Sequence, residues 1–307
     1  MPGSDPPPVR WWPVPLGAAL PWAWFPVRDL GGPVEGVAVL LPVLVTIAAI
    51  ILLGLALGRR RVRLLTVVAS LVVFGVVCVV GPLLPHRGPA PVAPLTLVSA
   101  NLYLNNTTPE AAVNALLAVG ADVEVAVESN PQHLAALERI DTAHPYSASD
   151  GQLVVRSRYP VTAMLDPAHV PTRRILAVTI DAPAGPFLLY AVHSLNPLSE
   201  STFASQLVWV ERLLRAAARE TLPVVIAGDF NMSDRQLGYR RLAGEMRDAI
   251  TAGGWGHMTF SDGVWAPLFL RIDHVFVSRQ WCATDGRTVD LPGSDHEGVA
   301  VQIGHCP

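Results

Sequence analysis

Two long apolar segments near the start of the chain restrict what it can fold into. Residues Gly36 to Leu57 and Leu64 to Leu84 carry no charged side chain. A helix needs about 20 apolar residues to cross roughly 30 Å of hydrocarbon, and each segment is long enough to do so. A buried core helix is one alternative, and a signal peptide is another for the later segment. Two such runs in succession, the later one too long for a signal peptide, predict a transmembrane helical hairpin.

Basic residues between the two segments predict how this hairpin lies in the membrane. The connecting loop, Arg59–Arg63, is almost entirely arginine. Short basic loops stay on the cytoplasmic side of a membrane. The second helix then ends on the outer face, so the chain from residue 86 onward is predicted to be extracytoplasmic. We therefore expect a multi-pass protein of the cell membrane.

The segment Trp11–Val27 is also uncharged, but it is rich in tryptophan and proline. Its prolines would interrupt a short helix, and tryptophan favours the interface between membrane and water. We interpret the segment as an interfacial or re-entrant element, with a degenerate first membrane span as the alternative. In that alternative the N-terminus lies in the cytoplasm. Residues 1–10 are proline-rich and predicted to be disordered.

Composition divides the chain into four parts. Residues 1–35 are the proline- and tryptophan-rich segment, and residues 36–84 hold the two predicted transmembrane helices. Residues 85–94 are again proline-rich, which is typical of an extended, semi-rigid linker. Residues 95–307 form the predicted catalytic domain.

The last of these parts alternates strand and helix patterns. The predicted strands are Leu95–Tyr103, Val123–Glu128, Gln152–Arg156, Val161–Leu165, Arg174–Asp181, Phe187–His193, Val224–Asp229, Ile272–Ser278 and Val299–Ile303. The predicted helices are Pro109–Val119 with Thr108 as its N-cap, Pro131–Ile140 and Ser199–Glu220. Such a mixture suits sheets packed face to face with helices outside them.

Polar clusters lie next to two of the predicted buried strands. Gly228-Asp229-Phe230-Asn231 follows the apolar run that ends at Ala227, and Ser294-Asp295-His296 precedes the last strand. Carboxylates and imidazoles at the ends of buried strands are costly to desolvate unless they serve a metal or each other. Both clusters are therefore candidate parts of a functional site.

With four further segments in chain order, these clusters resemble the endonuclease/exonuclease/phosphatase superfamily, the fold of DNase I-like nucleases, sphingomyelinases and inositol-phosphate phosphatases. The resemblance covers roughly residues 95–304. Its motifs are Ser99–Tyr103, Val125–Glu128, Tyr190–His193, Gly228–Asn231, Arg271–Phe276 and Ser294–His296. Gly298 stands where the family usually has proline, which affects a turn and not a ligand. The resemblance implies a four-layer α/β/β/α sandwich with the site at one edge.

The resemblance also implies metal-assisted hydrolysis of a phosphate ester and assigns residues to it. The implied metal ligands are Glu128, Asp295 and Asn101. The implied catalytic residues are His193, Asp229, Asn231, Asp273 and His296, and the implied substrate contacts are Asn101, Asn231 and His296. Mg²⁺ is the implied cofactor, with Mn²⁺ or Ca²⁺ as alternatives, because hard cations prefer carboxylate oxygens.

Each catalytic assignment has a chemical reason. Asp229 would position or deprotonate the attacking water, and Asn231 would donate to a phosphoryl oxygen. Their spacing would place both on one side of an extended backbone. His296 would bind the phosphate or act as a general base, while Asp273 would fix its tautomer. His193 is a candidate general acid.

The remaining histidines and two arginines receive weaker interpretations. His274 follows Asp273 directly, so it points to the opposite face of its strand, and we interpret it as structural. No motif includes His133, His144, His169, His257 or His305. Arg173 and Arg174 could reach an anionic substrate, although an arginine before a strand is commonly a solvated edge residue.

Charge and location narrow the class of substrate. Residues 95–307 hold 15 Arg against 22 Asp and Glu, a net charge of −7, whereas the first 94 residues hold 7 Arg against 3 acids, a net of +4. Non-specific nucleic-acid binding usually requires a basic surface, so nucleic acid is the less favoured partner. A lipid-linked or small phosphate ester at the outer leaflet is favoured. The architecture also resembles bacterial membrane proteins linked to teicoplanin-type resistance, which suggests a cell-wall lipid carrier.

Two alternative functions remain: an exported endonuclease or exonuclease, and a catalytically silent membrane scaffold. Of the three cysteines, Cys78 lies inside the second predicted span and is interpreted as packing. Cys282 and Cys306 lie in the exported half, where a disulfide can form, but a sequence does not give connectivity. The sequence does not predict an oligomeric state.

Overall fold

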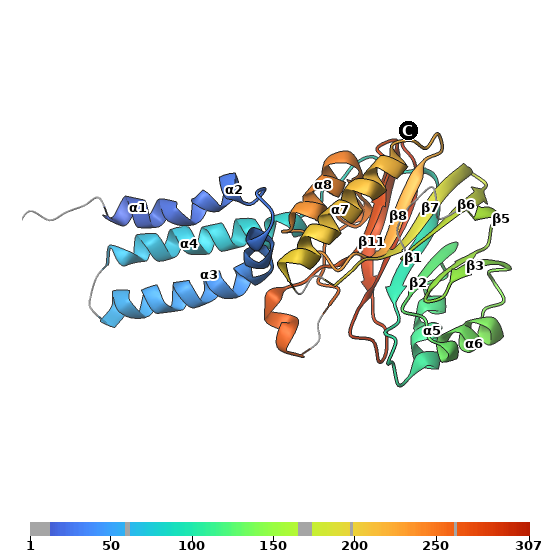
Figure 1. Ribbon diagram of the computed structural model, residues 1–307, viewed down its shortest axis with the longest axis horizontal. Helices are drawn as coiled ribbons and strands as arrows, with labels where there is room; N and C mark the ends of the chain where they lie inside the picture. Colours follow the sequence, from blue (N-terminus) through green and yellow to red (C-terminus); the bar gives the residue numbers. More distant parts are fainter. Residues whose placement is uncertain (1–12, 59–61, 165–173, 197–198, 261–262) are drawn as a thin grey trace, which may run out of the picture.

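The computed structural model describes residues 13–58, 62–164, 174–196, 199–260 and 263–307, which form a helical N-terminal part beside a two-sheet part (Figure 1). The helical part contains α1 (Pro13–Ala19), η1 (Leu20–Ala23), α2 (Trp24–Val27), α3 (Pro33–Gly58), α4 (Leu64–Val79) and η2 (Gly81–Leu83). Predictions for residues 1–12, and for three of the four loop arginines at 59–61, lie outside the described residues.

Two of these helical stretches, α3 and Leu64–Leu83, are long and apolar enough to span a membrane. In the most apolar window of each stretch, 17% is buried. Large side chains such as Ile47, Ile50 and Val73 are exposed. This exposure argues against the alternative of core helices in a soluble protein, whose apolar side chains would be covered. Cys78 packs with Phe74 and Leu41 in the small core between the helices.

The tryptophan-rich segment runs along α4 instead of lying across its end (Figure 1). Ser70 of α4 donates a hydrogen bond to the carbonyl of Ala18 and accepts one from the indole of Trp22. The helical stretch Val14–Val27 is shorter than a membrane span requires.

The rest of the chain contains two six-stranded sheets. The first sheet has the order β11 (Trp281–Val289), β12 (Gly298–His305), β1 (Val92–Asn101), β2 (Val123–Val127), β4 (Leu153–Ser157) and β3 (Tyr146–Asp150). The second has the order β5 (Val161–Met164), β6 (Ile175–Ala182), β7 (Gly185–His193), β8 (Val224–Asp229), β10 (Asp273–Val277) and β9 (Arg247–Asp248).

The sheets pack face to face and helices cover their outer faces, as predicted (Figure 1). Side chains such as Leu97, Val125 and Leu189 fill the space between the sheets. Helices α5 (Pro109–Ala118) and α6 (Pro131–Ile140) pack on the first sheet. Helices α7 (Glu200–Ala217) and α8 (Leu237–Glu245) pack on the second. The fold is therefore the four-layer α/β/β/α sandwich.

Several local expectations differ from the structure. Thr108 precedes α5 but makes no side-chain cap, because its hydroxyl contacts Asn106 and Pro292 instead. The elements β3, α8, β9, α9 (Ala249–Gly253), η3 (Gly263–Leu268) and β11 were not predicted. The predicted linker, residues 85–94, is partly joined to the catalytic domain. Strand β1 already begins at Val92, and the backbone N–H of His86 donates to the carbonyl of Thr251.

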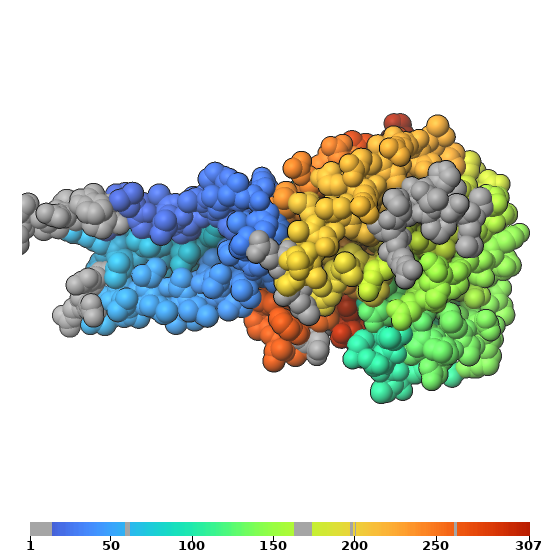
Figure 2. Space-filling view, in the orientation of Figure 1, coloured from blue at the N-terminus to red at the C-terminus, as the bar shows by residue number. Residues whose placement is uncertain are grey.

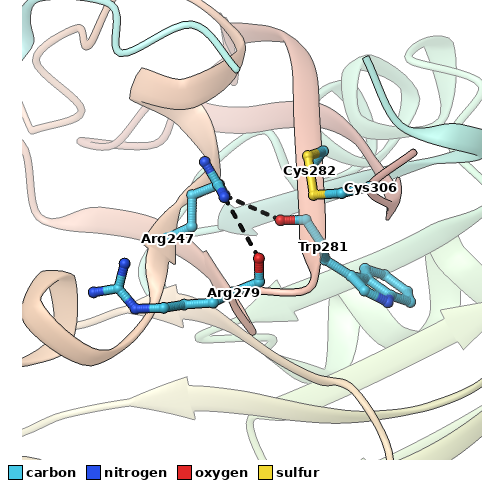
Figure 3. The surroundings of a disulfide bond; sticks show 5 residues. All are labelled: Arg247, Arg279, Trp281, Cys282 and Cys306. Atoms are coloured by element: carbon cyan, nitrogen blue, oxygen red, sulfur yellow. Dashed lines mark hydrogen bonds between the residues drawn. A yellow bond between two sulfur atoms is a disulfide. The ribbon is translucent and has the colours of Figure 1, made fainter. Parts of the chain in front are cut away.

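A disulfide joins β11 to the end of the chain (Figure 3). Cys282 and Cys306 have Cα atoms 4.9 Å apart, which answers the pairing question that the sequence leaves open. Arg247 stands beside this bond and donates to the carbonyls of Trp281 and Arg279 (Figure 3). The start of β11, one of the strands that sequence patterns miss, is thus held both covalently and by hydrogen bonds.

Candidate active site

The topology brings six strand ends to one edge of the sandwich. Strands β1 and β2 are parallel, as are β7 and β8, and all four reach this edge with their C-terminal ends. Strands β12 and β10 run antiparallel to β1 and β8, so they begin at the same edge. The motif residues lie at or beside these ends, which explains why segments far apart in the chain meet.

A cavity of about 560 Å³ opens at this edge. It is lined by six of the predicted site residues, Glu128, His193, Asp229, Asn231, Asp295 and His296. The other two, Asn101 and Asp273, are buried directly behind the wall and contact Asp229 and His296. The structure therefore brings all eight predicted residues together.

His296 is held by a carboxylate on its inner side. Its Nδ1 lies 2.8 Å from Asp273 Oδ2, and the ring of Phe260 packs edge-on against the imidazole. The hydroxyl of Thr259 accepts from the backbone N–H of Asp273 and so supports the carboxylate's strand. Burial acts to lower the pKa of His296, but Asp273 and Asp229 outweigh it and raise the pKa to about 10. The ring is thus an imidazolium at neutral pH.

Asp229 is fully buried at the end of β8. Its Oδ1 accepts from the backbone N–H of Asn231 at 2.7 Å, and its Oδ2 accepts from the amide of Asn101 at 3.0 Å. Burial raises the pKa of Asp229 to about 6, against the lowering effect of the His296 charge.

The expected extended backbone between Asp229 and Asn231 is wrong. Asn231 has φ +47°, in the left-handed region, so the chain turns directly after β8. The turn folds the Asn231 amide back to within 3.2 Å of Asp229 Oδ2. Asparagine tolerates this conformation better than most residues. The two side chains share the cavity because of a turn and not because of strand alternation.

Glu128 lines the same cavity, next to His193. Its Oε2 accepts from the backbone N–H of Leu104, and its Oε1 is 3.4 Å from His193 Nε2. That nitrogen is also 3.8 Å from Asp229 Oδ2. Ligand atoms of Glu128, His193 and Asp229 all lie within 4.8 Å of one another. Two carboxylates in such a group fit a divalent cation.

The other two predicted metal ligands are placed differently. Asp295 lines the same cavity beside His296. The Asn101 oxygen accepts from the backbone N–H of Tyr103, while its nitrogen faces Asp229 and lies 3.5 Å from His296 Nε2. In this orientation Asn101 presents a donor to the site. Positioning and substrate contact therefore suit Asn101 better than ligation of a cation.

Several histidines to which no catalytic role was assigned make structural contacts or lie outside the described residues. His274 is buried on the opposite face of β10, where Met232 and Arg271 contact its two nitrogens. Burial lowers the pKa of His274 to about 3, so the ring is neutral. His133 caps α6, and His144 pairs with Asp141. His169 and Arg173 lie outside the described residues.

Sequence patterns did not identify several residues that line the cavity. Arg174 is the exception, since its position already suggested contact with an anionic substrate; it lines the cavity, and its exposed side chain donates to the carbonyl of Ser194 at 3.4 Å. Asn196 also lines the cavity, and its position three residues after the predicted site residue His193 could have identified it. Val39 and Trp265 also line the cavity, but α3 and η3 contribute them from distant parts of the chain. No local pattern marks such residues.

The family comparison agrees with this geometry. The model of the Endonuclease/Exonuclease/phosphatase family matches residues 98–296, a range that contains every motif at the cavity. The chain belongs to the endonuclease/exonuclease/phosphatase family. Membership supports a hydrolase that acts on phosphate esters, and such enzymes usually require a divalent metal ion. No curated protein matches this family member at a significant level.

Solved structures of the family show the same fold. An endonuclease/exonuclease/phosphatase from Bacteroides vulgatus has a TM-score of 0.59 at 15% identity and covers 70% of this chain and 100% of its own. A family protein from Leptotrichia buccalis has a TM-score of 0.55 at 15% identity, covering 68% and 99%. D. rerio TDP2, humanised by 14 mutations, has a TM-score of 0.56 at 15% identity, covering 69% and 100%.

Proposed function

We propose that this protein is a membrane-anchored, extracytoplasmic and divalent-metal-dependent phosphoesterase. The favoured substrate is a lipid-linked or small phosphate ester, including a phosphate of a cell-wall lipid carrier. One observation carries the proposal: a single cavity unites two carboxylates suited to a cation, Glu128 and Asp229, with the imidazolium of His296.

Each residue of the cavity has its own proposed role in hydrolysis. Glu128 and Asp229, with Asp295 nearby, would hold a Mg²⁺ ion, which when bound neutralises charge on the phosphoryl oxygens. His296 is charged at neutral pH, so it suits phosphate binding and not the alternative role of general base. Asn231 would donate to a phosphoryl oxygen, and Asp229 would position the attacking water. His193, which lines the cavity beside Glu128, would donate to the leaving oxygen.

Membrane anchoring rests on α3 and α4 and on the arginines between them. Both helical stretches are long, apolar and exposed, and the loop Arg59–Arg63 is strongly basic. Short basic loops usually stay in the cytoplasm, and this tendency supports a two-sheet domain outside the cell. A net charge of −7 on residues 95–307 disfavours a nuclease, since DNA binding draws most of its affinity from contacts to phosphates.

The test is a substrate panel on the full chain in detergent, with Mg²⁺ or with EDTA. The panel contains a phosphomonoester, a lipid pyrophosphate, sphingomyelin and DNA. We expect turnover of a lipid or small ester that EDTA abolishes and His296→Ala removes, while the exposed His257→Ala serves as the matched control. Preference for DNA would favour the nuclease. No metal-dependent turnover of any substrate would favour a silent scaffold.

A further inference from the structure

The cavity has two chemically different walls. One wall carries the charged groups, including Glu128 and His296. The remaining wall is apolar and comes from Val39 of α3, from Trp265 and Leu268 of η3, and from the side chains Phe260, Leu270 and Ile272; it adjoins the charged wall where Phe260 packs against His296. A small phosphate ester would need only the first wall. The second wall therefore calls for a ligand with an apolar portion.

One arginine holds the apolar wall together. Arg235 is buried and donates from Nε to the carbonyl of Ala38 in α3 at 3.1 Å. Its other nitrogens donate to the carbonyls of Leu268 and Phe269 at the end of η3. Pro42 lies four residues after Ala38, where it has no N–H to complete the helical hydrogen bond. The guanidinium replaces that missing donor and joins α3 to η3.

Further polar contacts attach the start of α3 to the catalytic domain. The buried carboxylate of Glu35 accepts from the backbone N–H of Leu237 at the beginning of α8. Just before α3, Asp29 accepts two hydrogen bonds from Arg240. These contacts, with that of Arg235, join the catalytic domain to the start of a helix long enough to span a membrane, where the two parts of the chain meet (Figures 1 and 2).

The position of Val39 along α3 sets the depth of the apolar wall. Val39 lies six residues after Pro33, the first residue of α3, which corresponds to a rise of about 9 Å. The polar layer of a bilayer is roughly 5 to 8 Å thick on each side, so with Pro33 at the outer surface Val39 would lie near the boundary of the hydrocarbon. Beside it, Val264 and Trp265 of η3 and Phe269, which follows η3, are exposed. Exposed aromatic and aliphatic side chains at this level suit contact with lipid.

We propose that this wall binds the hydrocarbon chain of a phosphate ester that remains in the outer leaflet. The chain lies between Val39 and Trp265, and the phosphate reaches Glu128 and His296 without the lipid leaving the bilayer. The site thus selects amphiphilic, membrane-resident phosphate esters over soluble ones. This inference rests on the proposed phosphoesterase function and specifies its substrate class.

A chain-length comparison tests the selection. Alkyl phosphates and alkyl p-nitrophenyl phosphodiesters with an ethyl or a dodecyl chain are offered below micellar concentrations to the full chain in nanodiscs. We expect kcat/KM to be at least about tenfold higher for the dodecyl ester, because burying several methylene groups stabilises its complex. Trp265→Ala and Val39→Ser should each lower the dodecyl-to-ethyl ratio at least about fivefold. Trp255→Ala, an exposed tryptophan outside the cavity, should leave the ratio unchanged.

A binding measurement makes the inference independent of turnover. Dodecyl phosphate with a diazirine on its chain is photolysed with the full chain, and the labelled peptides are mapped by mass spectrometry. We expect adducts in the peptides that contain Val39 and Trp265, suppressed by unlabelled dodecyl phosphate and not by ethyl phosphate. A dodecyl-to-ethyl ratio of kcat/KM near one, together with adducts in other peptides, would overturn the inference and leave the phosphoesterase proposal intact. Specific adducts in the Val39 and Trp265 peptides, without hydrolysis of any ester, would contradict the proposed phosphoesterase function and leave the binding inference standing.

Discussion

His296 Nδ1 lies 2.8 Å from Asp273 Oδ2, behind the wall of the cavity. This carboxylate helps to raise the pKa of His296 to about 10, so the imidazolium persists across the physiological range. Asp273→Asn keeps the shape but removes the charge, and the pKa of His296 should fall. We expect kcat to drop about 100-fold at neutral pH, with the alkaline loss of activity beginning at lower pH. A pH–rate profile measures both effects, with the exposed Asp285→Asn as control.

Glu128 is expected to be necessary for metal-dependent turnover. It offers a partly exposed carboxylate at the cavity, and nothing else at the end of β2 replaces it. Glu128→Ala should lower turnover at least about 100-fold and raise the Mg²⁺ concentration that gives half-maximal rate. Circular dichroism should be unchanged, since the side chain is not part of the core. Near-full activity in this variant, with Glu138→Ala as the surface control, would mean that the site is misassigned.

A second acidic group, remote from the cavity, predicts how stability depends on pH. Glu124 is buried beneath α6 beside Asp141 and His144, and burial raises its pKa to about 7 from an ordinary 4.5. The folded chain therefore binds an additional proton between these values. Its contribution to stability is complete below about pH 4.5 and is lost as pH rises toward 7.

Glu124→Gln should remove this pH dependence. The free energy of unfolding of the wild type should fall by ~2 kcal/mol between pH 5 and pH 8 through this group, whereas the variant should change less over the same range. Denaturant unfolding of the full chain in detergent at several pH values measures the difference. Equal slopes for the two proteins would show that Glu124 titrates normally.

The motif residues could be predicted from sequence because each lies within a few positions of a strand end. Glu128 directly follows one strand and Asp229 ends another. Parallel strands bring such ends together at one edge of a sheet. The layers of the sandwich could be predicted from the mixture of strand and helix patterns and from the family resemblance. The turn at Asn231 could not, since the two-residue spacing fits either an extended strand or a left-handed turn.

Other features depend on contacts that no local pattern encodes. The start of β11 is apolar, but its later part contains Asp285 and Arg287, so a search for apolar alternation passes over it. Its place in the sheet is set by pairing with β12 and by the disulfide. Val39 enters the cavity wall through contacts with residues almost 200 positions later, such as those that Arg235 and Leu237 make to α3. The sequence thus predicts the polar half of the site and not the apolar half.

The disulfide is expected to contribute to the stability of the catalytic domain. Cys282 and Cys306 are separated by 24 residues, and closing a loop of this length restricts the unfolded chain. The loop-closure entropy corresponds to roughly 3 kcal/mol. The Cys282→Ala/Cys306→Ala double variant should lose about that much unfolding free energy and should no longer respond to dithiothreitol. A wild type whose melting temperature is insensitive to dithiothreitol would contradict this expectation.

The contact of Arg235 with Ala38 makes a final prediction about how the two parts of the chain are held together. Arg235→Met would keep most of the side-chain volume but leave the carbonyls of Ala38, Leu268 and Phe269 without this donor. The loss should cost about 3 kcal/mol or more locally, because buried carbonyls without partners are unfavourable. Hydrogen exchange should then increase around η3 and the first turns of α3, and not in β8. Arg241→Met, which removes an exposed arginine of α8, should leave the exchange pattern unchanged, and protection of η3 that survives Arg235→Met would show that packing alone holds it on α3.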